Sequence, residues 1–434
     1  MSIDTESASG EMEAAAGLMQ PLMLSTPKQE KWKRNPSPNG DYNSVAISAD
    51  GSRVLAGTFY YNDGTVVPPQ TVGVFAWDAN GQQLWTDTFM VTAADKARAG
   101  VESVAISADG LWGASGGLTS PGVGFVHVYD AAGAKTALLG TPTAVRAVAL
   151  SSDGMYLAAG ADKLYVFKRT GAGWSAPVTL ANPSGIVRRV SISDDGRWIV
   201  TAIDNGWTSL VENKLVSGGG VTAVGTWQLP NPNPSDPQPF VQHVAVSGDG
   251  SAYAAAGADG KTYYFDIAAF QPTNALAERW SYNPPGKSTC RWVAISQNGS
   301  HVAAVFSFDP NPMTPHTPTK GRTYLLQNIK NPAAGQRKYQ RLWTGGERTA
   351  YGPNAVSMGQ TSTGKYHVTV ADGITKTAGG FYLFDGSNGN SMWGGPPDHN
   401  FSTTKMNYCV AMSADATAIV GGSNDGYVYY FTVP

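Results

Sequence analysis

The sequence is poor in charged residues. Asp, Glu, Lys and Arg make up 14% of its 434 residues, whereas an average soluble protein has about 25%. The 30 basic and 32 acidic residues almost cancel, so the formal net charge is −2 and no basic stripe is visible. Because nucleic-acid-binding proteins need clustered Lys and Arg to neutralise phosphates, we expect no nucleic-acid partner.

Long apolar runs and helical periodicity are also missing. No stretch approaches the ~20 apolar residues of a membrane-spanning helix. The first 25 residues carry four acidic residues, with neither the basic start nor the long apolar core of a secretory signal. No segment sustains the 3.6-residue apolar period of helix-pair solenoids. We therefore expect no membrane span and a cytoplasmic location.

Motifs for metal, nucleotide or nucleophilic chemistry are absent as well. No P-loop, dinucleotide fingerprint or GxSxG occurs. The Asn-Asp-Gly triplets at 62–64 and 424–426 lack the other ligands of an EF-hand and are typical of hairpin turns. We expect no metal and no cofactor, because the six histidines are scattered without HxH or HExxH spacing: His127, His243, His301, His316, His367 and His399.

The sequence does contain one eight-residue phrase, written eight times with variations. A short apolar run that ends at Asp-Gly or Asn-Gly is typical of a buried strand that enters a tight hairpin turn. Three further short apolar runs follow each phrase, so one repeat is predicted to hold four strands. The phrase reads SVAISADG at Ser103, and the other copies begin at Ser44, Ala147, Arg189, His243, Trp292, Ala355 and Cys409.

The spacing of the phrases is that of propeller blades. The phrases start 42–63 residues apart, and a four-stranded blade needs about 40–50 residues. The last copy supplies three strands before the chain stops, whereas a lone segment around Trp32 precedes the first copy. Pairing the two closes a ring and removes exposed strand edges. The sequence therefore predicts an all-β, eight-bladed β-propeller at 28–434, closed by an N-terminal strand that completes the last blade, and a tail at 1–27.

Cys290 and Cys409 fall at the starts of the sixth and eighth copies. A full repeat separates them, which is too far for a disulfide bond, and they lack CxxC spacing. We expect both thiols to be buried and to have no redox role.

Insertions fall on two kinds of connection: between the second and third strands of a repeat, and between its fourth strand and the next repeat. Both emerge on the same face of an up-and-down blade. Long loops on a rigid scaffold usually carry binding residues, so we expect this long-loop face to be the binding face. The alternative is that the insertions are neutral changes in surface loops that tolerate them. A protein-binding role predicts exposed aromatic residues on the insertions, for which the candidates are Tyr60, Tyr61, Phe306, Phe308 and Tyr351.

Two known families share motifs with this chain. From Lys31 onward the repeated phrase and the Trp77-Asp78 pair resemble WD-repeat propellers. Asp385 to Trp393 and Ala76 to Trp85 resemble the A-x-D-x-x-T-G-x-x-x-W docking motif of quinoprotein-type propellers, in which Asp and Gly form a turn and Trp lies flat between blades. The vicinal Cys-Cys pair on which alcohol-oxidising members stack their cofactor is missing, so the resemblance implies no bound quinone.

A column of polar residues stands two positions before the first Val of each phrase. The first strand of a propeller blade is innermost, so these positions are predicted to form a ring at the mouth of the central channel, on the long-loop face. Arginine forks bind carboxylate or phosphate, which makes this channel-mouth ring a candidate anion site; a solvated rim with Arg–Glu pairing is the alternative. The ring residues are Asn43, Glu102, Arg146, Arg188, Gln242, Arg291, Asn354 and Tyr408.

These observations favour a non-enzymatic, rigid binding scaffold. Its long-loop face and channel mouth would bind a partner protein or a small anionic ligand. The alternative is a quinoprotein-like or other propeller enzyme with its site at the same mouth, where Glu102 is the only candidate base in the ring. An exported protein is the alternative to a cytoplasmic one, because sparse charge and many Gly, Asn and Thr are typical of exported propellers.

Overall fold

The computed structural model describes residues 30–37, 40–61, 70–91, 98–120, 123–171, 173–181, 185–231, 238–267, 276–286, 288–308, 320–348, 352–375, 378–393 and 401–434. Within these ranges every regular element is a strand, apart from the short 3₁₀ segments η1 (Asp204–Gly206) and η2 (Lys214–Ser217). None of the described helical segments has the length and apolarity to cross a membrane. The predicted 1–27 tail lies outside the described residues.

Seven antiparallel sheets contain these strands. Four of the sheets are meanders of four strands in chain order: β15 (Val187–Ile192), β16 (Trp198–Ile203), β17 (Trp207–Asn213) and β18 (Val221–Gln228); β19 (Val241–Val246), β20 (Ala252–Gly257), β21 (Thr262–Asp266) and β22 (Trp280–Tyr282); β23 (Thr289–Ile295), β24 (His301–Phe308), β25 (Lys320–Asn328) and β26 (Tyr339–Arg348); β27 (Pro353–Gln360), β28 (Tyr366–Thr375), β29 (Ala378–Asp385) and β30 (Phe401–Thr403).

Two further sheets depart from this plan. In one, both short outer strands pair with the same neighbour: β10 (Ala147–Leu150), β11 (Tyr156–Gly160) and β12 (Leu164–Thr170), with β13 (Gly173–Trp174) and β14 (Val178–Leu180) on β12. The other is eight-stranded, because the end of β3 also pairs with the start of β6. It joins two meanders: β2 (Asp41–Ile47), β3 (Arg53–Tyr61), β4 (Gln70–Asp78) and β5 (Gln83–Val91); β6 (Arg98–Ile106), β7 (Trp112–Ser120), β8 (Val123–Asp130) and β9 (Lys135–Thr141).

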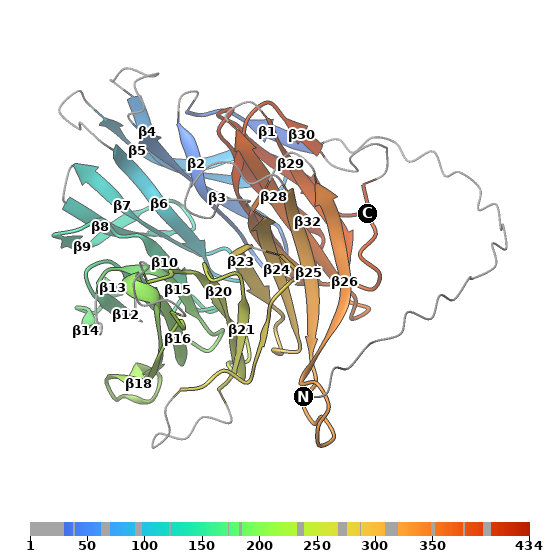
Figure 1. Cartoon of the computed structure of the whole chain (residues 1–434). Coiled ribbons are helices and arrows are strands. Elements are labelled where there is room, and N and C mark those ends of the chain that lie inside the picture. Colours follow the sequence, from blue (N-terminus) through green and yellow to red (C-terminus); the bar gives the residue numbers. More distant parts are fainter. Residues whose placement is uncertain are drawn as a thin grey trace.

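The N-terminal strand completes the last sheet, as predicted from the sequence. Its strand order is β1 (Trp32–Arg34), β33 (Val428–Thr432), β32 (Ala418–Ser423) and β31 (Asn407–Met412). Trp32 lies opposite Tyr430 in the ladder and stacks on its ring at 5.1 Å between centroids. In Figure 1 the blue strand β1 therefore lies among the red C-terminal strands.

In seven of the eight copies the repeated phrase forms the first hairpin of its repeat through one network of side-chain hydrogen bonds. In the copy at Ser103, the Ser107 hydroxyl donates to the Asp109 carboxylate at 2.5 Å and accepts from the Trp112 amide at 3.0 Å. Gly110 supplies the left-handed backbone of the turn, with φ +70°. The same network recurs at Ser48–Asp50, Ser151–Asp153, Ser193–Asp195, Ser247–Asp249, Ser296–Asn298 and Ser413–Asp415.

The first strands of the repeats follow one another in a closed circle. β2 contacts β6, and the sequence of contacts continues through β10, β15, β19, β23, β27 and β31 back to β2. Backbone hydrogen bonds also link neighbouring turns: the Ala49 amide donates to Ala108 O at 2.9 Å, and the Ala108 amide donates to Ser152 O at 2.9 Å. The Asp415 amide donates to Ala49 O at 3.3 Å, which joins the last phrase to the first.

Tryptophans of the fourth strands fill slots between neighbouring repeats. A Cβ on Gly133 would stand 2.5 Å from the ring of Trp85, and one on Gly389 would stand 2.8 Å from Trp343. The Trp343 indole N–H donates to Gly386 O at 2.9 Å. The turn that follows each third strand therefore needs glycine where the tryptophan of the preceding repeat lies beneath it.

Part of the expectation for the insertion aromatics is wrong. Tyr60 and Phe306 are 1% and 0% exposed, because β3 and β24 continue past the predicted strand ends and carry these rings into the core. Phe308 is half-buried, and the side chains of Tyr61 and Tyr351 lie outside the described residues. Cys290 and Cys409 are buried free thiols, as predicted.

Candidate functional site

The predicted ring residues share one backbone feature. In seven of the repeats the register between the first two strands shifts at the ring position, and in the remaining repeat Arg146 directly precedes β10. A β-bulge leaves one residue unpaired and redirects its side chain. The polar column in the sequence is thus a repeated interruption of the innermost ladder.

Glu102 and Arg146 meet across two neighbouring repeats. The Arg146 guanidinium donates to the Glu102 carboxylate at 2.6 Å, and Arg98 approaches the same carboxylate at 3.7 Å. The Glu102 side chain is 12% exposed. Burial raises the pKa of Glu102, and the positive charges of Arg98 and Arg189 oppose this shift. Two arginines therefore contact one carboxylate on this side of the ring, and the charge of a third, Arg189, also acts on it.

Arg188 lies on the surface beside an exposed aromatic ring. It pairs with Asp204, and its guanidinium lies 5.2 Å from the ring centroid of Phe240. Half of the Arg188 side chain is exposed, and Phe240 is 44% exposed. Arg188 of β15 supplies a cation, and Phe240, which directly precedes β19, supplies an accessible apolar ring beside it.

The other ring residues have local surroundings of their own. The Arg291 guanidinium donates to the Ser307 hydroxyl at 2.7 Å, and the Asn354 amide donates to Gly373 O at 2.7 Å and to Asn407 O at 2.9 Å. Asn43 and Gln242 are half-buried, and Tyr408 is 36% exposed. The structure thus brings Glu102 and Arg146 into contact, and it gives Arg188, Arg291 and Asn354 separate partners.

Three residues next to the ring were not among the predicted site residues. Arg189, His243 and Trp292 begin the fourth, fifth and sixth phrases, whereas all five other copies begin with Ser, Ala or Cys. His243 stacks on Trp292 with 3.8 Å between centroids, and the Arg189 guanidinium lies 5.3 Å from the Trp292 ring. The unusual size of these three phrase-start residues was the available sequence signal.

The electrostatics of this stack keep its histidine neutral. Burial lowers the pKa of His243 well below its ordinary value, and the nearby charge of Arg189 lowers it further. Its Nδ1 atom makes no hydrogen bond within the described part of the chain. Among the same residues, no three His, Cys, Asp or Glu side chains come together around a possible metal position.

No family model and no curated protein matches the sequence. Solved structures of WD40 β-propeller proteins do match the fold. The Cps50 (Swd1) β-propeller domain of Myceliophteria thermophila has a TM-score of 0.52 at 12% identity, over 77% of this chain and 96% of that chain. A chain of the mitotic checkpoint complex has a TM-score of 0.54 at 13% identity, over 99% of both chains.

A third solved structure has a higher TM-score. Sqt1 of Chaetomium thermophilum, bound to the N-terminus of the ribosomal protein L10, has a TM-score of 0.63 at 13% identity, over 92% of this chain and 100% of that chain. At these identities the likeness shows the fold alone, an all-β propeller. The quinoprotein resemblance stays a prediction.

Proposed function

We propose that the chain is an eight-bladed propeller that serves as a rigid, non-enzymatic binding scaffold. Its long-loop face and channel mouth would bind an anionic group, carried by a partner protein or by a small ligand. The closed circle of eight first strands and the hydrogen bonds between neighbouring turns support both the blade count and the rigidity.

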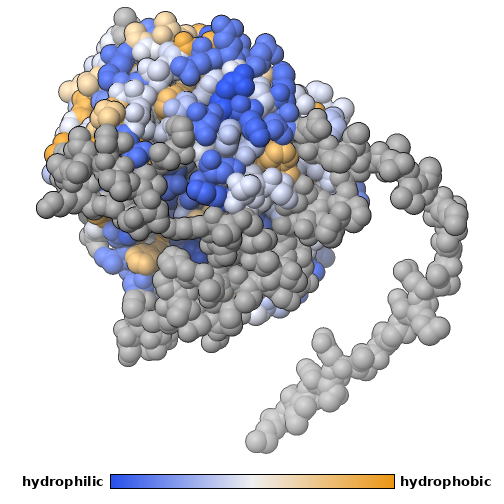
Figure 2. Space-filling view, turned by 90° about the horizontal axis from the view of Figure 1, so that it is seen from above, coloured by the Kyte–Doolittle hydropathy of each residue, from blue (hydrophilic) through white to orange (hydrophobic). Residues whose placement is uncertain are grey.

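The observation that carries the proposal of a protein partner is the pair of Arg188 and Phe240. Arginine and aromatic side chains are enriched in protein interfaces and their hot spots, and a guanidinium is attracted to the face of an aromatic ring. Large exposed apolar side chains are few in the described residues, and Figure 2 shows hydrophobic residues scattered among hydrophilic ones. Tyr408, Met90 and Val123 are further exposed residues at strand ends of the long-loop face.

The solved neighbours point in the same direction. Sqt1 was solved bound to the N-terminus of a ribosomal protein, and another neighbour is a chain of the mitotic checkpoint complex. Propellers of this shape thus form protein complexes, which favours a protein partner for this chain.

The charge around Glu102 favours an anionic group on the ligand. Arg98 and Arg146 share this single carboxylate, which leaves a local excess of positive charge. Arginine forks pair well with carboxylate and phosphate. A small anion that binds only the folded protein stabilises it by roughly 2.7 kcal/mol at a hundredfold excess over its dissociation constant.

Two arms of one experiment distinguish the sources of the anion. In the first, thermal unfolding is followed with tricarboxylates, dicarboxylates, phosphates and sugar acids. A rise in melting temperature that the double variant Arg146→Gln/Arg291→Gln abolishes, and that Lys365→Gln preserves, supports a small ligand.

In the second arm, affinity capture with the wild type is compared with capture by Arg188→Ala/Phe240→Ala and by Leu111→Ala. Leu111 lies on a first-hairpin turn, on the opposite face. A protein lost only from the first variant supports a protein partner, and no effect in either arm contradicts the proposal.

A further inference from the structure

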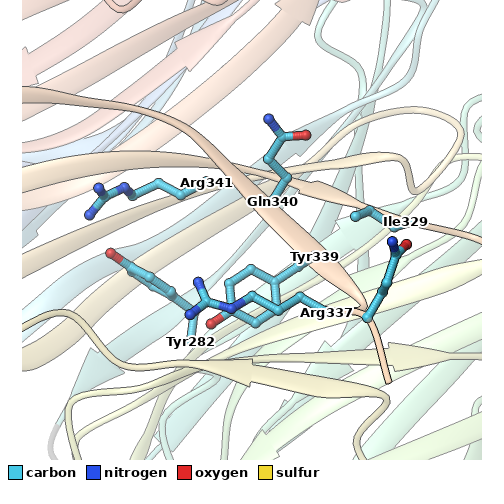
Figure 3. Close-up of a pocket in the computed structure, with 7 residues that line it drawn as sticks. Tyr282, Ile329, Arg337, Tyr339, Gln340 and Arg341 are labelled. Carbon is cyan, nitrogen blue, oxygen red and sulfur yellow. The ribbon is translucent and has the colours of Figure 1, made fainter. Parts of the chain in front are cut away.

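A groove on the outer rim lies apart from the channel mouth. It has a volume of about 550 Å³, within the range of about 300–1,000 Å³ typical of ligand sites. Tyr282 of β22 forms one wall, and Tyr339 to Arg341 of β26 form the other. Gln336 and Arg337 come from the loop between β25 and β26 (Figure 3). The groove therefore joins the outer strands of two neighbouring repeats.

The floor of this rim groove is a packed aromatic cluster. Tyr282 is 6% exposed and meets Tyr339 edge to face at 5.8 Å between centroids. Tyr339 also packs against Trp280 at 5.1 Å, and Tyr282 packs against Tyr324 at 5.2 Å. Such interlocked rings hold the groove open without a ligand, so little ordering is needed when a ligand binds.

Positive charge borders the groove, where two arginines, Arg337 and Arg341, are the charged residues of its lining. Residues 329–343 contain four basic residues and no acidic one, although the chain as a whole is slightly acidic. All four are exposed, and within the described chain none of them forms an ion pair. Arg279 nearby differs, because Asp266 lies 3.3 Å from it. The four are Lys330, Arg337, Lys338 and Arg341.

We propose that the rim groove binds an acidic, extended segment of a partner protein. Figure 3 shows Arg337 and Arg341 both extending toward Tyr282, so two guanidinium forks border one aromatic floor. Such forks hold carboxylates bidentately. In the described part of the chain β26 is also the last strand of its sheet, so an extended segment can run along its outer edge.

The chemistry of the groove favours a peptide over a nucleic acid. Single-stranded nucleic acid binds where aromatic faces are open for base stacking. Here Tyr282 is buried and Tyr339 is half-buried, so no ring face is free to receive a base. Carboxylates along a peptide need only the exposed cations that border the groove.

The test uses fluorescein-labelled octaglutamate and the full chain, with binding followed by fluorescence anisotropy at 50 mM salt. We expect saturable binding that weakens at least tenfold in Arg337→Glu/Arg341→Glu, and that falls when salt is raised to 300 mM. Lys163→Glu/Lys365→Glu, which makes the same change in net charge at two exposed lysines elsewhere, should bind as the wild type does.

Several results would overturn the proposal. Equal binding by the wild type and Arg337→Glu/Arg341→Glu would show that the groove is not the site. Tighter binding of oligo(dT) or oligo(U) through the same arginines would assign the groove to nucleic acid. A tenfold gain in octaglutamate affinity on removing residues 1–27 would assign it to the chain's own acidic segment, which carries Asp4, Glu6, Glu11 and Glu13. Unchanged circular dichroism and melting temperature exclude misfolding of the variants.

Discussion

Trp32 lies beneath Gly81, so that the first strand of the chain is locked against the repeat that follows it. A Cβ on Gly81 would stand 2.8 Å from the indole ring, and the indole N–H donates to Ala79 O at 3.2 Å. The other face of Trp32 stacks on Tyr430. One side chain thus joins the last repeat to the first.

Trp32→Ala should therefore destabilise the fold strongly. Trp32 is 6% exposed, and removing a buried tryptophan costs about 3–5 kcal/mol. Urea denaturation measures the change. Deleting residues 1–34 should lower the melting temperature further, because it also frees the edge of β33, whereas deleting 1–27 should leave it unaltered. An unchanged melting temperature after deletion of 1–34 would mean that β1 does not secure the ring.

The slots above the tryptophans can be tested with a matched pair of glycines. Gly133 has φ +84° and would place a Cβ 2.5 Å from Trp85, whereas Gly335 has φ +82° and open space around it. Alanine in a left-handed conformation costs roughly 1–2 kcal/mol at either position. Gly133→Ala should cost about 1–3 kcal/mol more, from forced overpacking. Equal losses in thermal unfolding would argue against the slot.

The hairpin network makes stability depend on pH on the acidic side. At Asp249 burial alone would raise the pKa, but hydrogen bonds from Ser247 and Ser251 lower it below its ordinary value. The pKa of Asp50 is lowered in the same way, by hydrogen bonds from Ser48 and Ser52 that outweigh the effect of burial. A carboxylate with a lowered folded pKa stabilises the fold above its unfolded pKa of about 3.9, and this contribution is lost as pH falls. The melting temperature should decline below about pH 4.

Asp249→Asn separates the charge from the turn geometry. The sixth phrase already has Asn298 at this position, and its side chain accepts the same hydrogen bonds. The variant should keep most of its stability at pH 7 and show a shallower loss between pH 4 and pH 2. The melting temperature across this range measures the difference, and a slope identical to that of the wild type would exclude Asp249 as a contributor.

Glu102 and Arg146 should be energetically coupled. Their 2.6 Å contact is partly shielded, with side chains 12% and 25% exposed, and directly paired residues show coupling of about 0.5–3 kcal/mol. We expect a double-mutant cycle of Glu102→Gln and Arg146→Gln to give a value in this range by chemical denaturation. Zero coupling would mean that solvent screens the pair. Arg197 and Glu212, which are paired at 2.9 Å with half of the Arg197 side chain exposed, supply the control and should couple more weakly.

The repeat period and the turn residues were enough to predict the strands. Ser107, Asp109 and Gly110 act within one hairpin, so their spacing alone describes their structure. The pairing of Trp32 was predictable because the last copy of the repeat lacks a fourth strand and a lone segment around Trp32 precedes the first copy.

Features that depend on side-chain direction were harder to predict. Arg188 was expected in the ring, but its contact with Phe240 depends on how the bulge turns the guanidinium. Local composition places Phe306 in an insertion, whereas pairing with β25 extends β24 through this residue. The rim groove joins Tyr282 to Arg341 across two repeats, and nothing in either segment alone indicates that contact.

The pairing of β1 with β33 also has a consequence for the order of events during synthesis. Trp32 must wait for Tyr430, about 400 positions later, which is roughly 20–80 s at ribosomal rates of about 5–20 residues per second. This closing contact joins residues that lie about 400 positions apart, and contacts between residues far apart in the sequence form slowly. Until it forms, the nascent protein is an open arc with an apolar indole at one end. An arc of this kind can recruit a strand from a neighbouring molecule, so the interval before closure is when chaperone protection matters most.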